Sequence, residues 1–231
     1  MAKTVLRGES IKLRLQGYTF GQIKRELGVA KSTLSGWLRN LPLSEEQILL
    51  LSKNRLISRD IRIEKFRQTA RNKWIARLKT KLSEQEKVLL PLTEKELFIA
   101  GVFLYWGEGS KQRGTVAISN TDPRVIKFAL HWLTKVLGVQ KEKVYVRLHL
   151  YKDMDRNAEE SFWSDTLNIP KCQFKASYVK KTNREGITYK SFGHGTCNLL
   201  CFSVDLSEKI AMSIKAISEF YGAKSDKFWY N

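Results

Sequence analysis

The sequence predicts an α+β fold in which helices come first and a region of mixed helices and strands follows. Residues 6–40 contain short apolar segments at helical spacing that end at glycines, and residues 53–81 contain neither Pro nor Gly. After residue 109 the spacing of apolar residues changes repeatedly between helical and strand periods. We therefore expect three parts: residues 1–43, 44–92 and 93–231.

Composition limits the kinds of partner that this chain can have. Its 231 residues carry a formal net charge of +18, which favours a polyanion such as nucleic acid. The N-terminal residues lack an apolar signal region, and no segment reaches the roughly 18 apolar residues of a membrane span. The expected location is cytoplasmic and nucleoid-associated, with neither a membrane nor a small-molecule substrate as partner.

Cysteine usage indicates free thiols. Cys172, Cys197 and Cys201 are an odd number without paired spacing, which argues against a disulfide framework. The default for such residues is a buried thiol. A zinc site would require Cys172 and His194 to converge on the other two cysteines. His194 lies between two glycines, a pattern that favours a tight hairpin turn.

Residues 6–40 read as three short helices. The first covers Ser10–Gln16 and stops at Gly17. Thr19 can cap the second helix, which continues to Leu27 and is followed by Gly28, a natural left-handed terminator. The third helix is expected over Lys31–Asn40. The small core of these helices is expected to contain Ile23, Leu27, Val29, Leu34 and Leu38.

The segment GYTFGQIKRELGVAKSTLSGWLRN resembles a helix-turn-helix of the resolvase or homeodomain-like kind. In such motifs the second helix enters the major groove through its N-terminal residues. The resemblance implies that Arg39 lies near the DNA backbone. It places four other residues at base edges: Lys31, Ser32, Thr33 and Ser35. The alternative is an unrelated helical hairpin that contacts a partner protein.

Residues 44–92 predict a basic helical linker. Ser44, followed by Glu45-Glu46-Gln47, is typical of a capped helix start. Eleven Lys or Arg residues stand between 53 and 81, against only Asp60 and Glu64, and apolar residues interleave with them. This pattern favours one or two long helices that contact phosphates and give binding a steep salt dependence. The alternative is an ordinary solvated helix face.

The segment Leu97–Lys111 combines an apolar helix with a carboxylate. Thr93 and Glu96 predict a capping box, and no polar residue occurs from Leu97 to Trp106. Gly107-Glu108-Gly109 then ends the helix. A carboxylate beside apolar surface needs a partner such as a cation, and small residues such as Ala100 and Gly101 allow backbones to approach closely.

Alternating strands and helices are expected after this segment. Residues 143–151 alternate cleanly, which predicts a strand with one apolar face. Its opposite face carries Lys143, Tyr145, Arg147, His149 and Tyr151. The other expected elements are a strand over 115–119, a helix over 121–137, a helix over 159–168, strands within 174–181 and 187–204, and a final helix over 205–220.

The run IAGVFLYWGEGSK is similar to the signature helix of the LAGLIDADG homing-endonuclease family, and the resemblance covers roughly residues 93–222. It implies a saddle of antiparallel strands that lies over DNA. It also implies that two signature helices pack side by side and that their terminal acids hold divalent metal ions at the scissile phosphates. Because this chain has one such run, the two acids would come from a homodimer. Tyr105 and Trp106 are bulkier than the residues usual at these positions.

The resemblance assigns residue roles. Glu108 would ligate Mg²⁺ or another divalent cation, since carboxylate oxygens suit hard cations. Lys111, the nearest lysine, would stabilise charge on the phosphate, with Lys180 and Lys175 as more distant candidates. The outward residues of the 143–151 strand would face double-stranded DNA.

We therefore expect sequence-specific double-stranded DNA binding and divalent-metal-dependent endonuclease activity by a homodimer. The main alternative is a non-catalytic transcription regulator on the same scaffold, in which Lys111 or Arg113 would hold Glu108 in a salt bridge. A third possibility is a protein that binds RNA or assists splicing.

Overall fold

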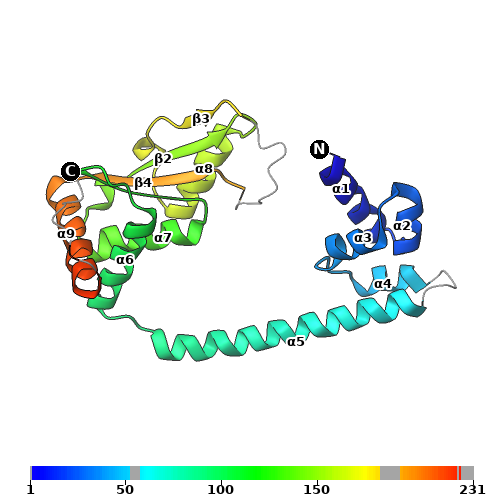
Figure 1. Ribbon diagram of the computed structural model, residues 1–231. Coiled ribbons are helices and arrows are strands. Elements are labelled where there is room, and N and C mark those ends of the chain that lie inside the picture. The colour runs from blue at the N-terminus through cyan, green and yellow to red at the C-terminus, as the bar shows by residue number, and fades with distance from the viewer. Residues whose placement is uncertain (1, 53–57, 183–192, 223, 225–231) are drawn as a thin grey trace. The chain divides into compact units, whose positions relative to one another are not determined.

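The computed structural model describes residues 2–52, 58–182, 193–222 and 224, and it divides into two compact units. Unit 1 covers Met1–Leu90 and unit 2 covers Pro91–Asn231 (Figure 1). Within the described ranges, no helix is both long and apolar enough to cross a membrane.

Unit 1 is helical throughout its described residues (Figure 1). Thr19 accepts a hydrogen bond from the Gln22 N–H, and the Gln22 side chain accepts one from the Thr19 N–H, which confirms the predicted cap. Gly28 ends this helix with φ of 65°, as predicted. The helices are α1 (Ala2–Leu15), α2 (Phe20–Leu27), α3 (Lys31–Leu38), α4 (Glu45–Ser52) and α5 (Ser58–Leu89).

The predicted start of the first helix at Ser10 is wrong, since α1 begins at Ala2. Ser10 is buried inside the helix, and its hydroxyl donates to the Leu6 carbonyl at 2.7 Å, so it does not act as a cap. The core between α1, α2 and α3 is small. Its buried members are Ile23, Val29, Leu34 and Leu38, with Leu27 partly buried at the edge.

A buried ion pair joins α5 to the rest of unit 1. The Arg14 guanidinium in α1 donates to the Glu64 carboxylate in α5 at 2.8 Å and to the Tyr18 carbonyl at 3.0 Å. Arg67 donates to the same carboxylate at 2.9 Å. The Arg14 guanidinium also lies 4.5 Å from the centre of the Phe20 ring. The first part of α5 is therefore fixed against the three-helix core.

Unit 2 is a mixed α+β structure whose described strands form a four-stranded sheet in the order β1-β4-β2-β3 (Figure 1). β4 is antiparallel to both β1 and β2, whereas β3 is parallel to β2. The predicted antiparallel sheet is therefore wrong for β3, because α8 connects β2 to β3 as a crossover. The elements are α6 (Glu94–Glu108), β1 (Thr115–Asn120), α7 (Pro123–His131), η1 (Trp132–Val136), η2 (Lys141–Lys143), β2 (Tyr145–Tyr151), α8 (Arg156–Leu167), η3 (Lys171–Gln173), β3 (Tyr178–Lys180), β4 (Thr196–Phe202) and α9 (Val204–Tyr221).

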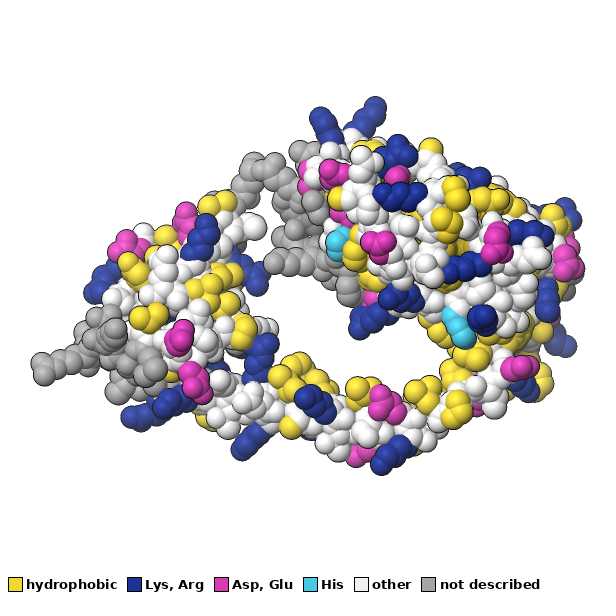
Figure 2. Space-filling model, turned by 180° about the vertical axis from the view of Figure 1, so that it is seen from behind, with side chains coloured by type: hydrophobic (Ala, Val, Ile, Leu, Met, Phe, Trp, Pro, Cys, Tyr) yellow, Lys and Arg dark blue, Asp and Glu magenta, His cyan; other side chains and the backbone are white. Residues whose placement is uncertain are grey.

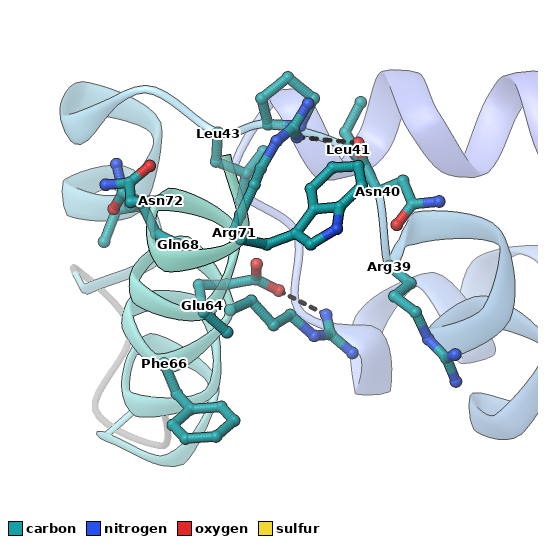
Figure 3. Close-up of a pocket in the computed structure, with 14 residues that line it drawn as sticks. Arg39, Asn40, Leu41, Leu43, Glu64, Phe66, Gln68, Arg71 and Asn72 are labelled. Carbon is teal, nitrogen blue, oxygen red and sulfur yellow. Dashed lines mark hydrogen bonds and ion pairs between the residues drawn. The ribbon is translucent and has the colours of Figure 1, made fainter. Parts of the chain in front are cut away.

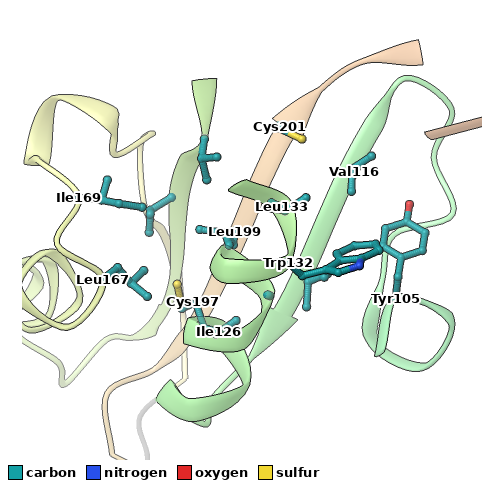
Figure 4. Close-up of a cluster of buried hydrophobic side chains, with 14 of the residues drawn as sticks. Tyr105, Val116, Ile126, Trp132, Leu133, Leu167, Ile169, Cys197, Leu199 and Cys201 are labelled. Atoms are coloured by element: carbon teal, nitrogen blue, oxygen red, sulfur yellow. The ribbon is translucent and has the colours of Figure 1, made fainter. Parts of the chain in front are cut away.

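The core of unit 2 lies between one face of the sheet and its helices (Figure 4). Alternate strand residues are fully buried there, such as Val146 and Leu148 of β2 and Leu199 of β4. They pack with α6, α7, η1, α8 and α9. The predicted alternation of β2 is therefore confirmed. The part of the strand prediction that covers residues 187–192 lies outside the described residues.

The long helix predicted over 121–137 is interrupted. Asp122 caps α7, but a π-helix, η1, follows it, in which the Leu137 N–H bonds to the Trp132 carbonyl. The wider turn places Trp132 and Leu133 side by side in the core. Gly101 of α6 faces the Trp132 indole, since a Cβ at Gly101 would lie 2.0 Å from its Nε1. Gly101 is therefore required by packing within its own chain.

Candidate nucleic-acid interface

The sheet of unit 2 has a second face, which points away from the core. We call it the outer sheet face. The strand registers place thirteen side chains on it: Thr115, Ala117, Ser119, Tyr145, Arg147, His149, Tyr151, Tyr178, Lys180, Thr196, Asn198, Leu200 and Phe202. The ionisable residues among them are basic or aromatic, so this face attracts anions.

Cations and aromatic rings alternate on the outer sheet face. The Lys175 ammonium lies 4.0 Å from the centre of the Tyr145 ring, and the Lys180 ammonium lies 4.6 Å from that of Tyr151. Tyr145 also contacts Phe202, with ring centres 5.9 Å apart. These contacts hold the lysines against the sheet. Four residues that were predicted to face DNA, Tyr145, Arg147, His149 and Tyr151, thus share one surface. Lys180, which was predicted to stabilise charge on the phosphate, lies on the same surface.

The surroundings of His149 disfavour its protonated imidazole. Partial burial lowers the pKa of its imidazole below the ordinary value, and the positive charges of Arg147 and Lys180 lower it further. Its ring packs edge-on against Tyr178, with centres 5.6 Å apart. A nearby anion would reverse this effect, since it would favour the protonated imidazole.

Lys143 is the exception among the predicted strand residues. It ends the short turn η2, where its N–H bonds to the Gln140 carbonyl at 2.9 Å, and β2 begins only at Tyr145. The prediction that Lys143 lies on the strand is therefore wrong. Its side chain is exposed, outside the registered face.

Glu108 lies at the edge of the outer sheet face. The last residues of α6 and three strands enclose a hollow of about 380 Å³ that is lined by Glu108, Arg147, Asn198 and Phe202, among others. Glu108 is exposed at the end of α6. Within the described part of the chain, neither Lys111 nor Arg113 forms a salt bridge with it: Arg113 pairs with Glu208 at 2.7 Å. The carboxylate is thus available to a ligand.

Lys111 caps the C-terminal end of α6. Its ammonium donates to the carbonyls of Tyr105 at 3.0 Å, Trp106 at 3.0 Å and Gly109 at 2.7 Å. Partial burial lowers the pKa of this amine. The Tyr105 carbonyl also accepts the Gly109 N–H, and the positive charge of Lys111 complements the negative end of the helix dipole. The predicted contact between Lys111 and phosphate would require these bonds to be given up, whereas Arg147 lines the hollow directly.

The hollow offers oxygen ligands suited to a hard cation. Glu108 supplies a carboxylate, and the buried amide oxygen of Asn198 has no hydrogen-bond partner among the described residues. Such an oxygen favours a cation or a hydrogen-bond donor as its ligand. Among the described residues, no group of three or more His, Cys, Asp or Glu side chains converges as a metal site would require. Within the described ranges, Glu108 is the one carboxylate that lines the hollow.

In unit 1, the predicted DNA-contacting residues of α3 are mostly exposed. Lys31, Ser32, Thr33 and Arg39 all have exposed side chains. Ser35 differs, because it is only partly exposed and its hydroxyl accepts a hydrogen bond from Arg67 at 3.1 Å. Ser35 thus helps to hold α5 against α3.

A pocket of about 760 Å³ lies between the residues after α3 and the first half of α5 (Figure 3). Arg71 lines it and donates to the Asn40 carbonyl at 3.2 Å. Glu64, Arg67 and Trp74 are among the other lining residues. Sequence reasoning missed the Arg14–Glu64 pair. Glu64 is one of only two acids in a strongly basic stretch. That rarity was the available signal that Glu64 pairs with a buried basic residue.

The cysteines and His194 do not form the alternative zinc site within the described residues. Cys172 is exposed on η3, whereas Cys197 and Cys201 are buried, and burial raises the pKa of the Cys201 thiol to about 11. The His194 ring stacks on Phe162, with centres 3.5 Å apart, and its Nδ1 lies 2.8 Å from Glu159.

Comparisons of the chain with protein-family models, curated proteins and solved structures give no significant match.

Proposed function

We propose that this protein binds double-stranded DNA through the outer sheet face of unit 2 and the helix α3 of unit 1. The outer sheet face is the observation that carries the proposal, because Arg147, Lys175 and Lys180 are arranged on it with aromatic rings between them. Phosphate contacts from basic side chains supply most of the affinity of proteins for DNA.

Unit 1 supports the same proposal. The order α2, short turn, α3 resembles a helix-turn-helix, and the start of α3 exposes Lys31, Ser32 and Thr33. Short polar side chains at the start of a recognition helix are suited to base edges. The exposed basic residues of α5, such as Lys65 and Lys73, would add phosphate contacts.

We further propose that the bound DNA is cut with the help of a divalent cation such as Mg²⁺, as the resemblance of α6 to a LAGLIDADG helix implies. Glu108 would hold the ion, the Asn198 amide oxygen would assist, and Arg147 would face the phosphate. The ion would stabilise charge on the oxygens of the scissile phosphate. A second copy of Glu108 would come from a homodimer.

The contact between the two copies would use the exposed side of α6. Phe103 and Trp106 are exposed there with ring centres 5.8 Å apart, and both line a hollow with Ile217 and Tyr221 of α9. Tyr105 is buried in the core of its own chain, and so is Gly101. Of the two bulky residues in this segment, Trp106 is therefore the one that a partner would meet.

DNA binding is tested with the full chain on a labelled duplex over a series of salt concentrations. The double substitution Arg147→Ala with Lys180→Ala should weaken binding and reduce the slope of log K against log salt by about two. Lys127→Ala with Lys135→Ala, two exposed lysines of α7 and η1, is the matched control. Equal affinity and slope in both double variants would exclude the outer sheet face.

Cleavage is tested by nicking of a supercoiled plasmid in Mg²⁺. Glu108→Gln should abolish nicking and leave duplex affinity intact, whereas Glu94→Gln, in the exposed first turn of α6, should cleave normally. Intact plasmid with the unsubstituted protein, together with tight duplex binding, would favour the second candidate, a transcription regulator. The observation that favours this candidate is that, in the part of the chain that the structure describes, Glu108 is the one carboxylate lining the hollow. A preference for structured RNA at matched salt would overturn both candidates.

A further inference from the structure

We infer that α5 carries a self-association surface, and that its occupant is the α5 helix of a second copy in antiparallel orientation. The surface consists of Ile75, Leu78, Leu82 and Leu89, which we call the α5 stripe. This inference concerns unit 1 and does not depend on DNA binding or cleavage.

The α5 stripe has the spacing of a coiled-coil contact surface. Successive members of the series Arg71, Ile75, Leu78, Leu82, Gln85 and Leu89 are four or three residues apart in alternation. At 3.6 residues per turn this series stays on one side of a helix for about 27 Å. The polar residue Gln85 interrupts it at one position, and such a residue in a coiled coil specifies register.

The α5 stripe is uncovered in the structure. Every side chain from Gln68 to Leu90 is exposed, and the exposed fractions of Ile75, Leu78, Leu82 and Leu89 are 37%, 43%, 60% and 54%. Figure 2 shows hydrophobic side chains at intervals along this helix. Isolated helices are marginally stable in water, and an apolar stripe is what a stable helix normally packs against a neighbour.

The stripe continues the face by which α5 already packs. Glu64, Arg67 and Arg71 lie on the same side of the helix, one to three turns earlier, and they contact Arg14, Ser35 and the Asn40 carbonyl of their own unit. Just before the stripe, this side is therefore filled by α1 and α3. In a parallel dimer, α1 and α3 of both copies would occupy the same space before the start of the stripe. In an antiparallel dimer, α1 and α3 of the partner lie at the opposite end of the stripe.

The charges beside the stripe favour the same orientation. At 3.6 residues per turn, Lys79 and Glu86 lie on the same flank of the stripe, Lys79 in its first half and Glu86 in its second half. Both side chains are exposed. In an antiparallel pair centred near Leu82, Lys79 of each helix faces Glu86 of the other. A partner with this apolar spacing and this charge order is therefore a second α5.

The first experiment measures the mass of the full chain by sedimentation over a range of concentrations. The unsubstituted protein should be a dimer in the micromolar range. Leu78→Glu with Leu82→Glu should raise the dimer dissociation constant by about 100-fold or more, because two charges enter an apolar contact. Thr80→Glu with Ser83→Glu adds the same charge on the opposite side of α5 and should remain dimeric. Circular dichroism checks that the helix is retained in both.

Charge exchange tests the pairing without touching the stripe. A variant with Lys79→Glu and a variant with Glu86→Lys should each be monomeric alone. Mixed together they should form a heterodimer, because the flank of one then carries only acidic side chains at these two positions and faces a flank that carries only basic ones.

Orientation is tested by oxidation of single cysteines in a Cys172→Ser background, since Cys172 is the exposed thiol. Ile75→Cys mixed with Leu89→Cys should give a crosslinked dimer, and Ile75→Cys alone should give none. A dimer crosslinked through Ile75→Cys alone would overturn the antiparallel arrangement. A monomer at all concentrations, with the amides of α5 protected from exchange, would show that the same chain covers the stripe and would overturn the inference. The α5 variants leave Phe103, Trp106 and Glu108 unchanged, so their outcome is separate from that of the cleavage test.

Discussion

The buried core of unit 1 consists of a few aliphatic side chains, whereas the core of unit 2 occupies the space between one sheet face and several helices. Unit 1 adds a buried ion pair, in which the side chains of Arg14 and Glu64 are only 2% and 8% exposed. Unit 2 contains Trp132 and Trp163, both fully buried. Polar contacts position α5 against its neighbours, while shape complementarity positions α6 against the sheet.

This contrast indicates how each unit presents its basic surface. Rigidity in unit 1 depends on a small number of charged hydrogen bonds, so that single substitutions can release α5 from α3. In unit 2 the outer sheet face is the reverse side of a well-packed sheet, so its basic residues are replaceable without loss of the fold. Substitutions of the residues that make these contacts test whether the two units differ in this way.

The largest effect is expected at Glu64. Glu64→Ala should lower the free energy of unfolding of unit 1 by about 3–5 kcal/mol, because the buried charge of Arg14 loses the carboxylate that pairs with it. Hydrogen exchange of the full chain should show faster exchange in α1, α2 and α3 and unchanged rates in the sheet. Glu84→Ala, in the fully exposed part of α5, is the control. Equal losses in both variants would contradict the role given to the buried pair.

The second largest effect is expected for a substitution at Gly101. Gly101→Ala should destabilise unit 2 by about 3 kcal/mol, since its Cβ would overlap the Trp132 indole. Gly107→Ala on the same helix meets nothing within 4 Å and should stabilise α6 by about 0.5–1 kcal/mol. Thermal unfolding followed by tryptophan fluorescence compares the two. If Gly101→Ala altered only dimer formation, Gly101 would serve a contact between copies.

The two capping boxes should differ in their response to pH. Thr19→Ala should cost about 1 kcal/mol in unit 1, where the cap partner Gln22 is uncharged. In unit 2, hydrogen bonds from Thr93 hold the pKa of Glu96 below its ordinary value. That stabilisation is present above the pKa of the unfolded chain and is lost as pH falls through the folded pKa. Thr93→Ala should therefore weaken α6 at neutral pH and have less effect in acid, as measured by amide exchange.

The smallest effect concerns His149. Its pKa is lowered by burial and by Arg147 and Lys180, which disfavour the protonated imidazole in the free protein. Bound phosphates would raise that pKa, and binding would then take up a proton. Duplex affinity should accordingly rise modestly as pH falls from neutral into the acidic range. His149→Gln should flatten this dependence, and His131→Gln, on α7, should preserve it. A parallel change in both variants would assign the proton to another group.

Local signals predicted much of the fold. The caps at Thr19 and Thr93, the left-handed Gly28 and the alternation of β2 all depend on neighbouring residues, and all are present in the structure. The π-helix after α7 and the parallel pairing of β3 were not predicted. They depend on which distant side chains share the core, and spacing along the chain does not carry that information.

The candidate site was predicted less completely, for a similar reason. Alternation placed Arg147 and His149 on one strand face, and the structure adds Lys180 and Lys175 to that face. Proximity in sequence suggested Lys111 as the partner of a phosphate, but its ammonium is bound to the carbonyls of the preceding helix. The unpartnered amide oxygen of Asn198 gave no signal in the sequence, because its burial follows from strand pairing.

The turn after α6 fixes the main chain on both sides of Glu108. The Gly109 N–H bonds to the Tyr105 carbonyl and the Ser110 N–H to the Ala117 carbonyl, each at 2.8 Å, and the Tyr105 hydroxyl donates to the Ser110 carbonyl. A side chain at Gly109 would strike the Tyr105 carbonyl, at 2.4 Å. The reach of the carboxylate is thus set by its own two methylenes. An aspartate here would place the carboxylate oxygens about 1.5 Å, one bond length, closer to the backbone. The fixed backbone could not move to compensate for this difference.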